Sequence, residues 1–186
     1  MSSESALDRF ARHIDVRALS TEQFVRLLET LCMLDTAGAG IELRSLSTEV
    51  LVDIVAKASK DQIRAIGQHP ELRAVFLDEI FRRMSDHFVP EKARYVSLVV
   101  GWRFPNGGDE FDRFQTVIED GMCVSSADCG RDPDTTITVA VDDFIRLATG
   151  NAAVAAMFVT GKVKVKGEYA PAVRLSGYFD IPKPPG

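Results

Sequence analysis

The chain has 186 residues, 46% of them hydrophobic, and a formal net charge of −5 at pH 7. This composition is typical of a globular protein with a sizeable core, while the acidic balance and the lack of a run rich in lysine and arginine argue against nucleic-acid binding through phosphate contacts. The same balance disfavours standing attachment to an anionic membrane, and no stretch approaches the roughly 18 apolar residues of a membrane-spanning helix.

A targeting segment and a metal site are not indicated either. The first ten residues are polar and hold no apolar run of a signal peptide. The three cysteines, Cys32, Cys123 and Cys129, are an odd number, which fits reduced thiols in a cytoplasm. Cys123 and Cys129 have no histidine close by in the sequence, and their spacing is a poor match to zinc motifs. We therefore expect a cytoplasmic protein without a metal or other cofactor.

Short helices are predicted in the first third of the chain, where apolar residues recur at helical spacing. The apolar stripes are Phe24, Leu27, Leu28, Leu31 and Leu34 in one helix and Val50, Leu51, Ile54 and Val55 in the next. Three helix starts carry capping signals, namely Ser20 with Gln23, Ser47, and Ser59 with Gln62. The Ala-Gly-Ala-Gly run at residues 37–40 predicts a flexible break between the first two helices, and Gly67 is expected to end the third.

A longer helix is predicted between two prolines. Pro70 suits its first turn and Pro90 stops it. The apolar stripe of this helix leads to Met84 and Phe88, which predicts core packing. A sharper hypothesis is that the Met84–Phe88 end also lines a ligand cavity.

From Tyr95 onward the apolar period changes to two, which indicates β-strands. Five strands are expected, at residues 95–104, 113–119, 122–127, 135–141 and 162–166. Asp120-Gly121 is a hairpin signal between the second strand and the third. Lysines alternate with valines in the fifth strand, which predicts an exposed edge of the sheet.

Three short helices are expected around the fifth strand. Asp142 is expected to cap the first, which closes at Gly150, and Asn151 to cap the second, which closes at Gly161. Pro171 is expected to start the last. The second of these helices is rich in alanine, and small side chains opposite a sheet either leave room for a ligand or merely allow a close approach of helix and sheet.

The run from Asp134 to Phe179 combines these features in a particular order. It reads DTTITV, then DDFIRLATG, then AMFVTGKVKVKG, and then VRL. This order closely resembles the sterol carrier protein 2 (SCP2) family, in which a helix ending in glycine follows a strand, and a second short helix ends in a Phe-x-x-Gly-Lys turn before a strand with alternating lysines. Upstream, Trp102 and the run 118–121 resemble the bacterial branch of the family. The segment 168–171 departs from the family pattern.

The resemblance implies an α+β fold, in which a five-stranded, mostly antiparallel sheet is covered by helices. It covers residues 69–186 as a lipid-binding domain and leaves residues 1–68 as a helical N-terminal extension. It also implies a hydrophobic tunnel between sheet and helices that holds fatty acyl chains, sterols or similar lipids. The residues expected to line this tunnel are Met84, Phe88, Leu98, Val100, Trp102, Phe114, Ile137, Val139, Phe144, Leu147, Val154, Met157, Phe158, Val165, Leu175 and Phe179.

No catalytic constellation is visible in the sequence. A Gly-x-Ser-x-Gly elbow and a phosphate-binding loop are both missing. Of the histidines His13, His69 and His87, only His87 borders the expected tunnel, where it contacts a ligand head group or else the C-terminal dipole of its own helix. Catalytic and metal residues are therefore predicted to be none.

Two kinds of function remain open. The first is a lipid carrier or transfer module, and the alternative is an isomerase or cyclase type of enzyme that acts on a polyketide or steroid-like substrate by desolvation in the same pocket. A third and weaker hypothesis is a scaffold whose N-terminal helices bind a protein. The expected partner is a hydrophobic small molecule, with no nucleic acid and no stable membrane insertion, and a homodimer is left open.

The N-terminal extension is expected to pack against the lipid domain, because its apolar stripes are too short to bury themselves against each other. Only the segment 67–70 separates it from the next helix, which leaves no polar linker. Packing over one end of the tunnel would make the extension a lid or a selectivity element.

Overall fold

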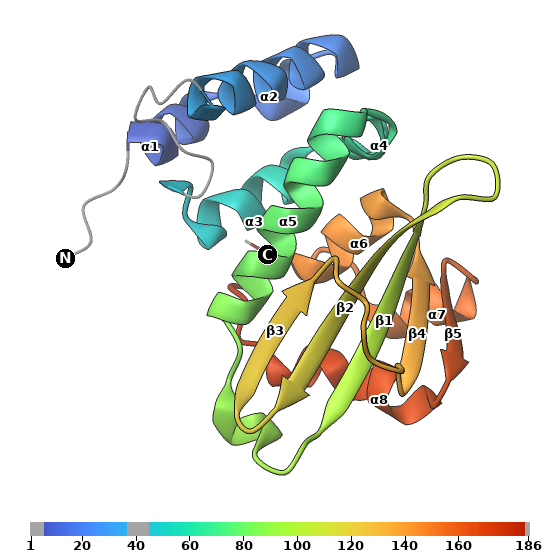
Figure 1. Cartoon of the computed structure of the whole chain (residues 1–186). Coiled ribbons are helices and arrows are strands. Elements are labelled where there is room, and N and C mark those ends of the chain that lie inside the picture. The colour runs from blue at the N-terminus through green and yellow to red at the C-terminus, as the bar shows by residue number, and fades with distance from the viewer. Residues whose placement is uncertain (1–5, 37–44, 185–186) are drawn as a thin grey trace.

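The computed structural model describes residues 6–36 and 45–184. In these ranges the protein has an α+β fold, in which helices pack with one five-stranded sheet (Figure 1). The expected break at residues 37–40 and the side chain of Leu34 lie outside the described residues. Over the described ranges, no helix combines the length and the apolar character that crossing a membrane requires.

The described residues of the N-terminal part form four α-helices, namely α1 (Ala6–His13), α2 (Thr21–Thr36), α3 (Thr48–Lys57) and α4 (Lys60–Gln68), and a 3₁₀ turn at Val16–Ala18. All three predicted capping signals are confirmed. Gln23 N donates to Ser20 Oγ over 3.1 Å and Ser20 N to Gln23 Oε1 over 2.9 Å, and Ser59 and Gln62 form the same pair of bonds. The Ser47 hydroxyl accepts from Val50 N over 3.2 Å. These bonds satisfy backbone N–H groups that a helix start leaves without a partner.

Helix α5 (Pro70–Asp86) runs between the N-terminal helices and the sheet (Figure 1). Its first turn has Pro70 at the expected place, and the His69 side chain caps it by accepting from Leu72 N. The helix contacts α2 and α4 on one side and α6 and the strand β3 on the other. It therefore belongs to the core of both parts of the molecule.

The sheet confirms the expected five strands, which lie in the order β3-β2-β1-β4-β5. Their bounds are Leu98–Pro105 (β1), Phe111–Glu119 (β2), Met122–Ser126 (β3), Thr135–Val139 (β4) and Val163–Gly167 (β5). Only β1 and β4 pair in parallel, so the sheet is mostly antiparallel. The hairpin between β2 and β3 has φ of 52° at Asp120 and 73° at Gly121, as a type I′ turn requires.

The first strand begins later than predicted. A 3₁₀ turn occupies Pro90–Ala93, and Tyr95 is 94% exposed, so the chain reaches the sheet only at Leu98. Period-two alternation cannot mark where pairing starts, because the residues before a strand can alternate in the same way. At the far edge, β5 exposes Lys164 and Lys166 as predicted.

Two predicted caps near the C-terminus are wrong. Helix α6 (Val141–Ala148) begins one residue before Asp142, after the uncapped Ala140, and Asp142 lies in its first turn. Helix α7 (Val154–Val159) begins after Ala153, and Asn151 does not cap it. Instead, the Asn151 amide donates to the carbonyl oxygen of Val52 on α3 over 3.2 Å, a contact across 99 residues that no local pattern reveals.

The glycines predicted to close these two helices are confirmed, since Gly150 (φ 72°) and Gly161 (φ 76°) take the left-handed conformation. The start of the last helix differs from the prediction by two residues. Helix α8 (Tyr169–Arg174) starts two residues before Pro171, and a 3₁₀ turn over Leu175–Tyr178 continues it.

The two faces of the sheet are covered differently. One face carries Trp102 and its neighbours and is covered by α5, α6, α7 and α8. The other face is crossed by the loop between β3 and β4, in which Arg131 O accepts from Gln115 Nε2 over 2.6 Å and Asp134 Oδ2 accepts from Val99 N over 2.8 Å. The helix-covered face is therefore where a cavity can form.

Candidate ligand cavity

A cavity of about 80 Å³ lies between the helix-covered face of the sheet and helices α5 to α8. We call it the sheet cavity. Its lining residues are Met84, Trp102, Ile137, Phe144, Leu147, Ala148, Val154, Phe158, Val163, Ala172, Leu175 and Ser176. Ser176 is the one polar residue among these twelve, and it is exposed, so the cavity reaches solvent near the end of α8.

The strand register builds the floor of the sheet cavity. Trp102 on β1 and Ile137 on β4 are direct partners, so their side chains point to the same face of the sheet. Phe144, Leu147 and Ala148 then follow at helical spacing on α6, which places them on one face of that helix.

The indole of Trp102 is held in a fixed position. Its Nε1–H donates to Thr116 Oγ1 over 2.9 Å, and that hydroxyl lies 2.7 Å from Ser125 Oγ. Phe81 and Phe144 lie against it with ring centroids 5.7 Å and 5.1 Å away. Since Trp102 is only 5% exposed, this aromatic cluster forms a rigid wall.

The opposite wall is loosely packed. Met157 is the only buried residue of α7, and Val159 at its end is 88% exposed. Phe158 contacts the ring of Tyr169, which is itself 56% exposed, with centroids 4.8 Å apart. An element with so little buried apolar surface opens at low free-energy cost, so α7 is the wall of the cavity that we expect to move.

Half of the residues that the sequence predicted for the tunnel line the sheet cavity: Met84, Trp102, Ile137, Phe144, Leu147, Val154, Phe158 and Leu175. The other eight lie around it without lining it. Leu98, Val100 and Val139 are buried on the same face of the sheet, Phe114 stacks on Phe81, Phe88 packs on Phe179, Met157 is buried on α7, and Val165 is half-buried on β5. That residues of either set of eight contact a ligand remains a prediction.

Sequence reasoning missed four lining residues: Ala148, Val163, Ala172 and Ser176. Val163 alternates with lysines on β5, and Ala148 follows Leu147, so the same periodicity contained a signal for both. Ala172 stands three residues before Leu175, so helical spacing contained a signal for it as well. Nothing in the sequence marks Ser176, because its place depends on how the last helical segment lies across the sheet.

The sheet cavity offers shape and apolar surface rather than reactive groups. None of its twelve described lining residues has a side chain that ionises. His87 lies at the end of α5 and its Nε2 is 3.0 Å from Thr48 Oγ1, so it faces the N-terminal helices. Cys123 is buried, and burial raises the pKa of its thiol to about 11. Within the described residues, no three histidine, cysteine, aspartate or glutamate side chains gather as a metal site would require.

Comparison with protein families gives one match. Residues 105–180 match the family described as the SCP-2 sterol transfer family. No curated protein is significantly similar to the chain in sequence.

Three solved structures illustrate the structural similarity. Sterol carrier protein 2 from Yarrowia lipolytica is 22% identical over 48% of this chain and 71% of its own, with a TM-score of 0.41. The sterol carrier protein domain 2 of Helicoverpa armigera is 25% identical over 47% and 68%, with a TM-score of 0.39. The sec-alkylsulfatase Pisa1 from Pseudomonas sp. is 14% identical over 91% of this chain but 31% of its own, with a TM-score of 0.52, which is a likeness of fold alone.

Proposed function

Because residues 105–180 match the SCP-2 sterol transfer family, we propose that this protein binds a fatty acyl chain, a sterol or a related lipid in the sheet cavity and serves as a lipid carrier or transfer module. One observation carries the proposal. The sheet and its covering helices enclose a cavity whose described lining lies within the family match except for Met84 and Trp102, and is apolar except for Ser176 at its solvent side. An apolar cavity with a polar group at the mouth suits an amphiphile that enters tail first.

The volume of the sheet cavity implies that binding requires movement. About 80 Å³ is far below the roughly 300–1,000 Å³ of sites that enclose a whole ligand of moderate size. The aromatic wall around Trp102 is tightly packed, whereas α7 is not, so a ligand displaces α7. Burial of about ten methylenes at about 0.8 kcal/mol each yields about 8 kcal/mol, which corresponds to micromolar affinity.

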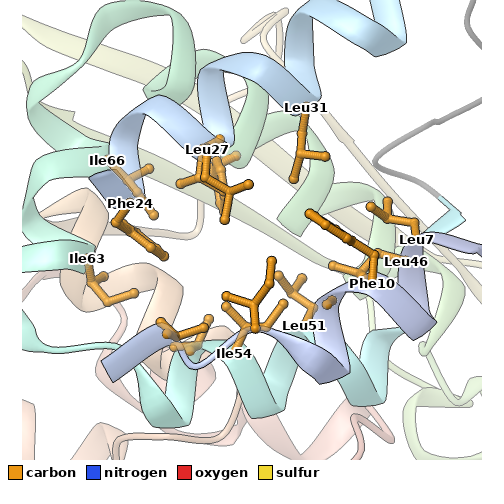
Figure 2. Close-up of a pocket in the computed structure, with 16 residues that line it drawn as sticks. Leu7, Phe10, Phe24, Leu27, Leu31, Leu46, Leu51, Ile54, Ile63 and Ile66 are labelled. Carbon is orange, nitrogen blue, oxygen red and sulfur yellow. The ribbon is translucent and has the colours of Figure 1, made fainter. Parts of the chain in front are cut away.

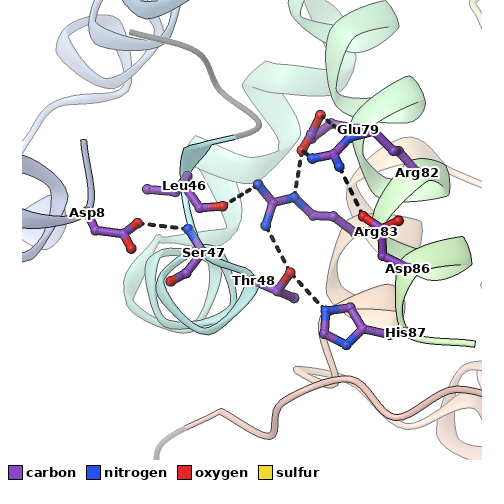
Figure 3. A network of polar contacts seen from close by, with 9 residues as sticks. All are labelled: Asp8, Leu46, Ser47, Thr48, Glu79, Arg82, Arg83, Asp86 and His87. Atoms are coloured by element: carbon purple, nitrogen blue, oxygen red, sulfur yellow. Dashed lines mark hydrogen bonds and ion pairs between the residues drawn. The ribbon is translucent and has the colours of Figure 1, made fainter. Parts of the chain in front are cut away.

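We also propose that residues 1–68 form a helical subdomain packed on a lipid domain of residues 69–186. Three polar contacts between the two parts support this proposal, one of them buried and two partly buried. Arg83 Nη2 on α5 donates to Leu46 O over 2.6 Å, Arg73 Nη1 donates to Gly67 O over 3.1 Å, and the Asn151 amide donates to Val52 O on α3 over 3.2 Å. Figure 3 shows the first of these contacts, with Thr48 placed between Arg83 and His87.

Titration of the purified protein with a panel of fatty acids, acyl-CoA esters and sterols tests the proposal. We expect saturable binding with a Kd of micromolar order for at least one class. Extraction and mass spectrometry after incubation should return the lipid unchanged. No binding across the panel would contradict the carrier function, and a converted product would replace it with the isomerase or cyclase alternative.

A further inference from the structure

A second apolar cavity lies among the N-terminal helices. Its volume is about 50 Å³, and its lining comes from α1, α2, α3, α4, α5 and the segments between them. All sixteen lining residues that the structure describes are leucine, isoleucine, valine, phenylalanine or alanine. Figure 2 shows their side chains pointing from facing helices toward a common space, which we call the helical cavity.

The helical cavity has a firm base and a solvent-facing rim. Phe24, Ile63 and Ile66 at the base are 2%, 1% and 1% exposed, as in the interior of a well-packed domain. At the rim, Phe10 is 49% exposed and Leu27 is half-buried. The exposed part of Phe10 marks the solvent-facing side of the lining, and we expect a ligand to enter there with one of its ends in water.

The size and chemistry of the helical cavity restrict its occupant. Side chains that offer no hydrogen bond hold water poorly, so an apolar occupant is favoured. An apolar cavity of about 150 Å³ holds a benzene ring, and about 50 Å³ is too small for one. The methyl end of a straight alkyl chain is apolar and narrower than a benzene ring, so it suits the helical cavity in both chemistry and size.

We propose that the helical cavity is a second binding site, which takes the methyl end of a single alkyl chain while the polar end of the ligand stays in water beyond Phe10. The proposal does not depend on the proposed function, because the helical and sheet cavities share no lining residue. Their only common element is α5, which contributes Phe76 to the helical cavity and Met84 to the sheet cavity.

Methyl NMR of the full chain can test the two cavities separately. The protein is labelled at isoleucine and leucine methyl groups and titrated with sodium decanoate below its micelle concentration. Leu27 and Ile54 report on the helical cavity, and Ile137 and Leu147 report on the sheet cavity. We expect saturable shifts at Leu27 and Ile54, with nuclear Overhauser contacts between their methyl groups and the terminal methyl of decanoate.

Cavity-filling variants identify the site. Ala11→Leu fills the helical cavity and should abolish the shifts at Ile54 while leaving those at Ile137, whereas Ala148→Leu fills the sheet cavity and should leave those at Ile54. Leu27→Phe fills the helical cavity from the facing helix and replaces Ala11→Leu if that variant does not fold.

Three results would overturn the proposal: no saturable shift at Ile54 in the natural chain, shifts that persist in a folded filled variant, or shifts that follow protein concentration without decanoate. The last result would assign this surface to contact between two copies of the chain. Shifts confined to Ile54, with none at Ile137, would keep this proposal and count against the proposed function instead.

Discussion

The guanidinium of Arg83 donates to the carbonyl oxygen of Leu46 over 2.6 Å, which ties the last turns of α5 to the residue just before the N-cap of α3. The same group donates to Glu79 Oε1 over 2.8 Å and to Thr48 Oγ1 over 3.0 Å (Figure 3). Arg83 is only 5% exposed, so its charge is satisfied by these protein groups rather than by water.

Replacement of Arg83 by methionine should therefore destabilise the whole chain. It removes one partner of a buried ion pair and leaves the Leu46 carbonyl without this donor, for which we expect a loss of about 3 kcal/mol in the free energy of unfolding. Urea denaturation provides the measurement. Arg82→Met is the matched control, because the Arg82 side chain is 41% exposed on the same helix and its replacement should cost less than about 1 kcal/mol. Equal losses in the two variants would contradict this account of the interface.

The same network predicts a dependence of stability on pH. Burial by itself raises the pKa of Glu79, but the hydrogen bond from Arg82 and the charges of Arg83 and Arg82 outweigh it and hold the pKa below its usual value. A carboxylate with a lowered folded-state pKa contributes stability that is present above its unfolded pKa and is lost as pH falls through the folded pKa. In Glu79→Gln, Tm should therefore fall less steeply than in the natural chain between about pH 5 and the acid limit. If Tm fell equally steeply with pH in Glu79→Gln and in the natural chain, Glu79 would make no such contribution.

Gly161 and Gly177 offer a matched pair for the helix stop after α7. Neither would bring a new Cβ within 4 Å of another group, but only Gly161 has a positive φ, 76°. Gly161→Ala should cost about 1–2 kcal/mol from backbone strain, and Gly177→Ala should be neutral or slightly stabilising. Thermal unfolding of both variants checks this. A neutral Gly161→Ala would mean that the left-handed stop is not required.

Local signals predicted much of this fold, whereas long-range contacts were beyond them. The capping boxes at Ser20 and Ser59 were predictable because their partners lie three residues away. Asn151 carries an equally good local capping signal, but its amide bonds to Val52 on α3 and the helix begins later. A prediction from one sequence cannot see a competitor that is distant in the chain.

The same difference between local signals and long-range contacts applies to the candidate site. Large side chains of the sheet cavity, such as Trp102 and Phe144, were expected from their periodicity and from the resemblance to the SCP2 family. Ala172 and Ser176 were not predicted to line the cavity, because a small side chain lines a cavity only when the residues opposite leave the space unfilled. The helical cavity was missed altogether, since the stripe that includes Leu27 predicts a packed core equally well.

Limited proteolysis of the full chain tests whether the N-terminal helices form part of one folded unit. We expect no stable fragment that begins near Pro70, since removal of the preceding residues would uncover Phe76 and take away the bonds from Arg73 to Gly67 and from Arg83 to Leu46. A soluble fragment from about Pro70 onward with undiminished lipid affinity would show that these helices neither cover the core nor affect the sheet cavity.

The central claim, lipid binding in the sheet cavity, has a direct reporter in Trp102, which lines this cavity and is the only tryptophan of the chain. The decisive measurement is energy transfer from Trp102 to a fluorescent polyene fatty acid or sterol during titration. We expect saturable transfer in the natural chain and an affinity at least tenfold weaker in Ala148→Leu, while Ala156→Leu, the same change at an exposed position of α7, should bind within about twofold of the natural chain. Absence of saturable transfer, or equal affinities in Ala148→Leu and Ala156→Leu, would contradict lipid binding at this site.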